Sequence, residues 1–156
     1  MARFEPVAHR RELASQLGWF ALWFGTTLIA AWLTPSPRGH ATHTQLGLPP
    51  CPSTLFFDRP CPGCGLTTSF SAIVHLDPLS AFRAHPFGPL LYAAFTVTAL
   101  LCLYGWFKRM RFNTATRAMD WALGTLVVVF FAFGVYRFFV TPNFNQVAVT
   151  QVRITR

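Results

Sequence analysis

Residues 84–107 read AHPFGPLLYAAFTVTALLCLYGWF and contain no Asp, Glu, Lys or Arg. A helix that crosses a bilayer needs about 20 consecutive apolar residues, so this stretch is long enough to span. Residues 13–37 have the same character, and so do residues 121–140 apart from Arg137. The three stretches predict an all-α integral membrane protein with about three transmembrane helices, at residues 13–33, 86–107 and 121–140.

The composition agrees with lipid as the main solvent. Of the 156 residues, 53% are hydrophobic, 16% are aromatic and only 12% are charged, which is too apolar for an ordinary soluble domain. A net charge of +8 would indicate nucleic-acid binding in a soluble protein. Here the basic residues flank the apolar stretches instead, so we expect membrane lipid as a partner and no nucleic acid.

The basic residues also predict an orientation. Arg10 and Arg11 precede the first stretch, and four more basic residues crowd the connection at residues 108–120. Because cytoplasmic loops collect Lys and Arg, we expect residues 1–12 and 108–120 to lie in the cytoplasm of a multi-pass cell-membrane protein. A guanidinium near a helix end can reach the lipid headgroups, which is the role expected for Arg137.

The insert between the first two stretches differs from the rest of the chain. Residues 34–84 are rich in Pro and Gly and hold three of the four cysteines and three of the five histidines. Their prolines predict a loop as far as residue 64. After Gly65 the apolar positions indicate a short amphipathic helix, and Asp77-Pro78 indicates the start of another, since Pro suits the first helical position. We expect this helical insert, residues 34–85, to lie along the membrane surface.

The sharpest chemical signal in the insert is the two-thiol turn Cys61-Pro62-Gly63-Cys64-Gly65. A Cys-Pro-x-Cys-Gly turn is typical of zinc knuckles, and a closed zinc site needs four ligands. Cys51 and a histidine are therefore needed to complete it, or two copies of the turn in a homo-oligomer. The predicted ligands of zinc or another soft metal are Cys61, Cys64, Cys51 and His75, with His40 or His43 as the alternative histidine.

The same cysteines fit two other interpretations. Two cysteines separated by two residues at a helix start can form a reversible disulfide. Cys61 and Cys64 would then be the catalytic pair of a membrane thiol-disulfide oxidoreductase, with Cys51 as a resolving partner. Against this, the thioredoxin-like βαβ context is missing. A static disulfide from Cys51 would only pin the loop, and all three interpretations stay open at this point.

Other polar or reactive residues receive structural interpretations. Cys102 lies between leucines in the second stretch, where a free thiol packs as a small hydrophobe. His40 and His43 are three residues apart, but their surroundings are loop-like, so we expect solvated side chains. The tail at residues 141–156 alternates weakly between apolar and polar residues, and we assign it no chemistry.

Cys51 and residues 61–67, Cys-Pro-Gly-Cys-Gly-Leu-Thr, form a pattern that resembles a known family. It is similar to the one found in small bacterial membrane proteins with the uncharacterised domain of unknown function 2752. Two positions depart from that family, because Thr68 stands where many members place Arg and His85 stands where Asn is common. The resemblance implies a multi-spanning protein of the bacterial plasma membrane and supplies no reaction.

The sequence favours a single membrane domain over residues 1–156 with a non-enzymatic role. In this hypothesis the extracytoplasmic cysteine turn binds a soft metal or forms a loop that docks a partner, either in a homo-oligomer or on another membrane protein. The alternative is the thiol-disulfide oxidoreductase. A transporter is disfavoured because the predicted spans hold no acidic residue.

Overall fold

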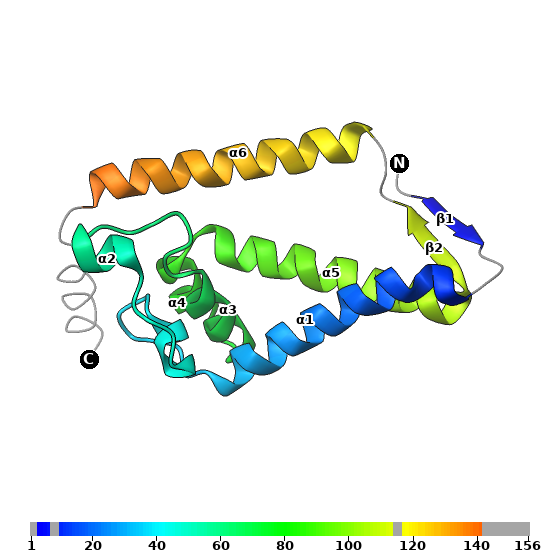
Figure 1. The fold of residues 1–156 in the computed structure, drawn as a ribbon, viewed down its shortest axis with the longest axis horizontal. Helices are drawn as coiled ribbons and strands as arrows, with labels where there is room; N and C mark the ends of the chain where they lie inside the picture. The colour runs from blue at the N-terminus through cyan, green and yellow to red at the C-terminus, as the bar shows by residue number, and fades with distance from the viewer. Residues whose placement is uncertain (1–2, 7–9, 114–116, 142–156) are drawn as a thin grey trace.

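The computed structural model describes residues 3–6, 10–113 and 117–141, and it is mostly helical, as predicted. The elements follow one another in the order shown in Figure 1. They are β1 (Arg3–Pro6), the 3-10 helix η1 (Arg10–Leu13), α1 (Ala14–Trp32), the 3-10 helix η2 (Thr42–Leu46), α2 (Pro52–Phe56), α3 (Leu66–Val74), α4 (Pro78–Ala84), α5 (Phe87–Lys108), β2 (Met110–Asn113) and α6 (Arg117–Val140).

Three long helices, α1, α5 and α6, cover the three apolar stretches. Within the described residues two helices are long and apolar enough to cross a membrane, Phe87–Lys108 and Asp120–Val140. Helix α1 is of similar length, but polar residues such as Gln16 and Thr26 lower its mean hydropathy. The structure therefore supplies two candidate spans where the sequence predicts three.

Helices α1 and α5 pack against each other along a polar seam. Trp19, Trp23 and Thr27 of α1 are spaced four residues apart and so share one face of the helix. Each meets a polar side chain of α5. The pairs are Trp19 Nε1–H to Thr98 Oγ1 at 3.2 Å, Trp23 Nε1–H to Thr96 Oγ1 at 3.0 Å, and the Thr27 and Tyr92 hydroxyls at 3.0 Å. The two helices are thus tied by hydrogen bonds as well as by apolar contact.

The insert folds against the end of this helix pair. As predicted, α3 begins after Gly65, and α4 begins after its N-cap Asp77, whose Oδ1 accepts a hydrogen bond from the Ser80 N–H at 3.0 Å. The buried Ser71 hydroxyl of α3 lies 2.9 Å from the Ala30 carbonyl and 2.6 Å from the Leu33 carbonyl. Helix α3 therefore covers the C-terminal end of α1, whose last carbonyls have no partner within their own helix.

The prediction of a loop through residue 64 is wrong at two places. Residues Thr42–Leu46 form η2, and Pro52–Phe56 form α2. Pro52 is compatible with a helix because it stands in the first turn, where its missing N–H is not needed. The Cys51 carbonyl accepts hydrogen bonds from the N–H groups of Thr54 and Leu55, each at 3.0 Å. Helix α2 thus begins directly after the first cysteine.

A short two-stranded sheet, which the all-α prediction omits, lies at the opposite end of α5 from the insert (Figure 1). Strands β1 and β2 are antiparallel, with Arg3 opposite Asn113 and Pro6 opposite Met110. The chain turns back at Arg109, which adopts a left-handed φ of 54°. Gly105 makes room for this return, because a Cβ there would lie 2.6 Å from the Met110 carbonyl oxygen. Residues 142–156, nearly all of the predicted tail, lie outside the described residues.

Candidate functional site

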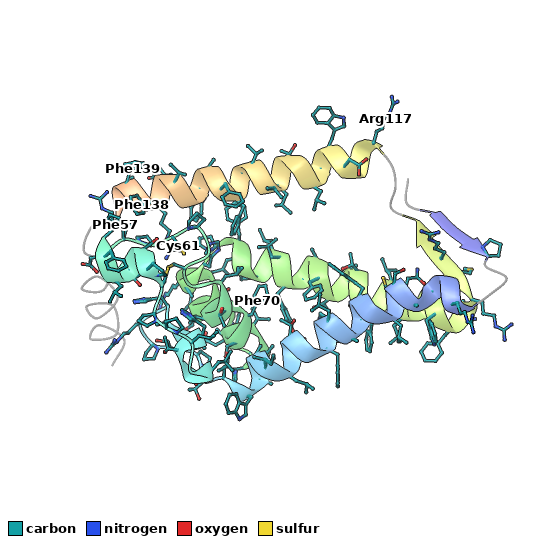
Figure 2. The ribbon with its side chains drawn as sticks, in the orientation of Figure 1. Phe57, Cys61, Phe70, Arg117, Phe138 and Phe139 are labelled. Atoms are coloured by element: carbon teal, nitrogen blue, oxygen red, sulfur yellow. The ribbon has the colours of Figure 1, made fainter. Side chains whose placement is uncertain are left out.

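Three cysteine thiols converge at the insert end of the molecule. The Cys61 sulfur lies 3.5 Å from the Cys51 sulfur and 3.2 Å from the Cys64 sulfur. All three sulfurs lie within 4.8 Å of one another, and none forms a disulfide. Cys61 lies close to the end of α6 that carries Phe138 (Figure 2). The structure therefore brings together the three cysteines that the sequence singles out, and we call them the thiol cluster.

The two-thiol turn holds its shape through backbone contacts. The Cys64 N–H donates to the Cys61 carbonyl at 3.0 Å, and the Leu66 N–H donates to the Gly63 carbonyl at 3.1 Å. Gly65 has a φ of +91°, and a Cβ there would lie 2.9 Å from the Gly39 carbonyl oxygen and closer still to that of Ala84. Only glycine fits this position, both for its left-handed conformation and for its lack of a side chain.

Helix α6 covers the backbone side of the turn. The Arg137 guanidinium donates to the Cys64 carbonyl at 3.0 Å and to the Ala84 carbonyl at 3.3 Å. Gly134 lies against Pro62, whose Cα would be 2.6 Å from a Cβ at that position. The expectation that Arg137 reaches the lipid headgroups is therefore wrong. Its planar fork of N–H groups instead binds two carbonyl oxygens that lie close together.

His85 supports the turn from the start of α5. The side chain is fully buried, and its Nε2–H donates to the Pro62 carbonyl at 3.0 Å. The ring lies among Phe87, Phe130 and Phe133, and its Nδ1 has no hydrogen-bond partner. Burial lowers the pKa of His85, against the opposing effect of the Pro62 carbonyl. We therefore assign a neutral ring with the proton on Nε2.

The thiols of the cluster differ in acidity. The hydrogen bond shared with Cys64 lowers the pKa of Cys61 to about 5; burial opposes the shift, and a hydrogen bond from Cys51 adds to it. The same shared hydrogen bond and burial raise the pKa of Cys64. One proton held between two sulfurs favours the state in which only one of them is ionised. The first thiolate of the cluster thus forms readily, and it is centred on Cys61.

A cavity of about 420 Å³ adjoins the thiol cluster. All three cysteines line it, together with His40 and His43, and none of the described Asp, Glu, Lys or Arg residues does. The His40 side chain is buried, with Nδ1–H donating to the Arg38 carbonyl at 2.9 Å, so the expectation of a solvated ring is wrong. His43 is half-buried, and its Nε2 lies 3.3 Å from the Pro49 carbonyl oxygen.

His75, the histidine predicted as a metal ligand, is not part of this arrangement. It caps the C-terminal end of α3, where its Nδ1 lies 2.8 Å from the Ser71 carbonyl oxygen, and its side chain is exposed. Within the described residues, neither the thiol cluster nor the lining of the cavity includes it. Cys102 is buried in α5 away from the cluster, in agreement with a packing role.

The sequence alone does not predict the support that His85, Gly134 and Arg137 give to the turn. One signal was present, since Arg137 is the only charged residue in an otherwise apolar stretch, and such residues often mark functional sites. Gly134 gave no comparable signal, and His85 stood out only as a departure from the family pattern. They lie 72 and 23 residues from Pro62 in sequence, a separation that no local pattern bridges.

Comparison with known proteins gives one match. No curated protein and no solved structure matches the chain. Residues 51–99, from the first cysteine of the cluster through α3 and α4 into α5, match the model of a family described as a protein of unknown function. The chain therefore carries a segment that resembles the DUF2752 family, in agreement with the resemblance noted from its cysteines.

Proposed function

We propose that this protein is a three-span membrane protein that binds a soft metal ion through Cys51, Cys61 and Cys64. The observation that carries the proposal is the convergence of three unpaired thiols within 4.8 Å of one another. Thiolate ligands select zinc, copper(I) and similar cations over magnesium or calcium, which prefer oxygen. The cluster contains no carboxylate, so a hard cation is not expected.

The spacing of the sulfurs fits one ion. Sulfur ligands at about 2.3 Å from a tetrahedral zinc ion lie about 3.8 Å apart. The observed separations of 3.2 and 3.5 Å need only small side-chain rotations to reach that value. The acidity of Cys61 favours the deprotonated form that a metal requires. The role of the chain is to hold three sulfurs on one side of the ion, with the turn supported from behind by His85 and Arg137.

The seam between α1 and α5 supports α1 as the third span. Polar side chains are costly in lipid unless they find partners, and hydrogen bonds between helices are a common solution. The indole N–H groups of Trp19 and Trp23 and the Thr27 hydroxyl all meet polar groups of α5. The modest hydropathy of α1 is therefore compatible with a helix that crosses the membrane beside α5.

The placement of charge supports the proposed orientation. The β1–β2 sheet brings the N-terminal segment next to the connection that follows α5, and both segments are basic. By the positive-inside rule this end faces the cytoplasm of the bacterial cell. The thiol cluster lies near the other end of α5, since His85, just before α5, donates to the Pro62 carbonyl of the turn, and Figure 2 shows Cys61 on that side of the molecule. The cluster would therefore face the outer side of the plasma membrane.

Metal content and thiol state, measured together, test the proposal. Protein extracted in mild detergent is analysed for metals, and its thiols are mapped by alkylation and mass spectrometry. We expect one equivalent of a soft metal with reduced thiols in wild type, and loss of the metal in Cys51→Ser and Cys61→Ser. Cys102→Ser is the matched control and should keep the metal. Metal-free wild type with a disulfide in the cluster would exclude the proposed site.

A thiol-disulfide oxidoreductase is the second candidate, because the low pKa of Cys61 and its position on the cavity suit a nucleophile. The Cys61 thiolate would attack a disulfide of a partner, form a mixed disulfide and release one partner thiolate. The Cys64 thiolate would then attack Cys61 and release the second, so that the partner is reduced and the cluster oxidised. Cys64→Ser combined with Cys51→Ser, which removes the other thiol near Cys61, should trap the mixed disulfide, whereas a metal site or a static disulfide should trap nothing.

A further inference from the structure

We infer that the cavity beside the thiol cluster holds the fourth coordination position of the metal site, and that a neutral imidazole group from outside the chain fills it. The inference rests on the proposed metal site and names the ligand that would complete it. A tetrahedral soft metal with three protein ligands keeps one position for a water molecule or another ligand.

The part of the chain that the structure describes does not complete the site. Within the described residues, the group of metal-binding atoms that lie within 4.8 Å of one another consists of the three cysteine sulfurs. The two histidines that line the cavity both have hydrogen-bond partners of their own. His40 Nδ1–H donates to the Arg38 carbonyl at 2.9 Å, and His43 Nε2 lies 3.3 Å from the Pro49 carbonyl oxygen. Neither ring belongs to the thiol cluster.

The direction of the open position follows from what surrounds the turn. Its backbone side is closed by His85 on the Pro62 carbonyl, Arg137 on the Cys64 carbonyl, and Gly134 against Pro62. Its sulfur side faces the cavity, since Cys51, Cys61 and Cys64 all line it. A ligand that reaches an ion held by the three sulfurs must therefore come through the cavity.

The size and charge of the cavity select the ligand class. Its volume of about 420 Å³ lies within the range of small-molecule pockets, and it exceeds what one water molecule needs. Three thiolates around a divalent ion carry one net negative charge, which the Arg137 guanidinium behind the turn offsets. Among the described residues, no basic side chain lines the cavity itself to compensate a further anion. A neutral nitrogen donor is therefore favoured over a carboxylate or a fourth thiolate. Imidazole is such a donor and suits zinc and copper.

Cobalt(II) substitution tests the inference with a spectroscopic readout. The full-length protein in detergent is loaded with cobalt, and its thiolate charge-transfer and d–d bands are followed during titration with imidazole. We expect saturable changes in the d–d bands while the thiolate bands persist. Azide, a smaller nitrogen donor that carries a negative charge, should bind about tenfold more weakly. Titration with N-acetyl-histidine methylamide distinguishes two sources of the imidazole group. If this blocked residue binds, a histidine of a partner protein is supported. If only free imidazole binds, a small molecule is supported.

A matched pair of variants tests whether the ligand binds in the cavity. Leu48 is 51% exposed and lines the cavity, whereas Leu46 is 42% exposed and does not. Leu48→Trp should weaken imidazole binding about tenfold without loss of cobalt, and Leu46→Trp should not change it. Cobalt bands that do not respond to imidazole in wild type would overturn the inference and leave the metal site standing. Failure to bind cobalt at the three thiols would overturn both.

Discussion

Helices α1 and α6 are both long and mostly apolar, but they are held in different ways. Helix α1 is tied to α5 along its length by three side-chain hydrogen bonds. In α6 the side chains of residues 120–129 are all exposed. Its contacts with the insert lie near its C-terminal end, where Phe138 packs on Phe57 and Arg137 binds the cysteine turn. The α1–α5 pair is therefore a scaffold that does not depend on the site, whereas the position of α6 and the shape of the site depend on each other.

Gly65→Ala is expected to have the largest effect on the metal site, because it distorts the cysteine turn and leaves the α1–α5 pair intact. A left-handed conformation costs alanine about 1–2 kcal/mol, and the new Cβ would also overlap the Ala84 and Gly39 carbonyls. We expect loss of bound metal with little change in helix content by circular dichroism. Gly63→Ala is the matched control, since a Cβ at Gly63 has no neighbour within 4 Å. Wild-type metal content in Gly65→Ala would contradict this account of the turn.

Arg137→Gln should release α6 from the turn. The substitution removes two hydrogen bonds from a charged donor, each worth about 1.5–3 kcal/mol. Hydrogen exchange should rise at residues 130–140 and stay unchanged at residues 19–27, and metal affinity should fall. Arg137→Lys keeps the charge but not the fork of donors, so we expect an intermediate effect. Arg83→Gln, on the exposed side of α4, serves as the control.

Gly134→Ala tests the same contact through shape instead of charge. A Cβ at Gly134 would overlap Pro62, and overpacking of this kind costs about 1–3 kcal/mol. The thermal unfolding midpoint and the metal affinity should both decrease. Gly124→Ala lies in the same helix at a position with no neighbour within 4 Å, so it should behave as wild type. Equal behaviour of the two variants would show that α6 does not bear on the turn.

The difference between the two helices also explains what the sequence could predict. The long helices follow from apolar composition, and α3 and α4 follow from Gly65 and from the Asp77-Pro78 start, because these signals act on neighbouring residues. The contacts that link α6 to the turn gave little signal. Arg137 and Cys64 are 73 residues apart, and nothing near Arg137 distinguishes a guanidinium that binds carbonyls from one that reaches the headgroups.

In two other places the structure differs from the prediction because the local sequence does not reveal the contacts that form. Strands β1 and β2 each have four residues and pair across more than 100 positions of sequence, so no alternation long enough to be recognised was present. The sequence predicts His75 on the polar face of the helix after the cysteines, as one of the histidines that could complete a four-ligand site. The helix ends there, and the His75 Nδ1 lies 2.8 Å from the Ser71 carbonyl oxygen. The three cysteines themselves are brought together because α2 starts at Cys51 and returns the chain to the turn.

His85 predicts a moderate dependence of stability on pH. Burial lowers its pKa in the folded state, so between that value and the unfolded value of about 6.5 only the unfolded chain binds the proton. The free energy of unfolding should therefore fall as the pH falls below about 6.5, by at most about 1.4 kcal/mol per pH unit. His85→Gln can keep a donor for the Pro62 carbonyl and should reduce this dependence, whereas His75→Gln should preserve it. Identical pH profiles for wild type and His85→Gln would exclude a neutral buried ring.

Single substitutions in the seam between α1 and α5 should have the smallest effects on stability and on metal content. Trp23→Phe removes the hydrogen bond to Thr96 and keeps an aromatic ring, and hydrogen bonds between membrane helices average about 0.6 kcal/mol. The thermal midpoint should drop slightly and the metal content should not change, because the scaffold shares no residue with the site. Trp32→Phe, at a side chain that is 70% exposed, should leave the midpoint unchanged. Loss of metal in Trp23→Phe would show that the scaffold and the site are coupled after all, since the seam would then be needed to position the insert.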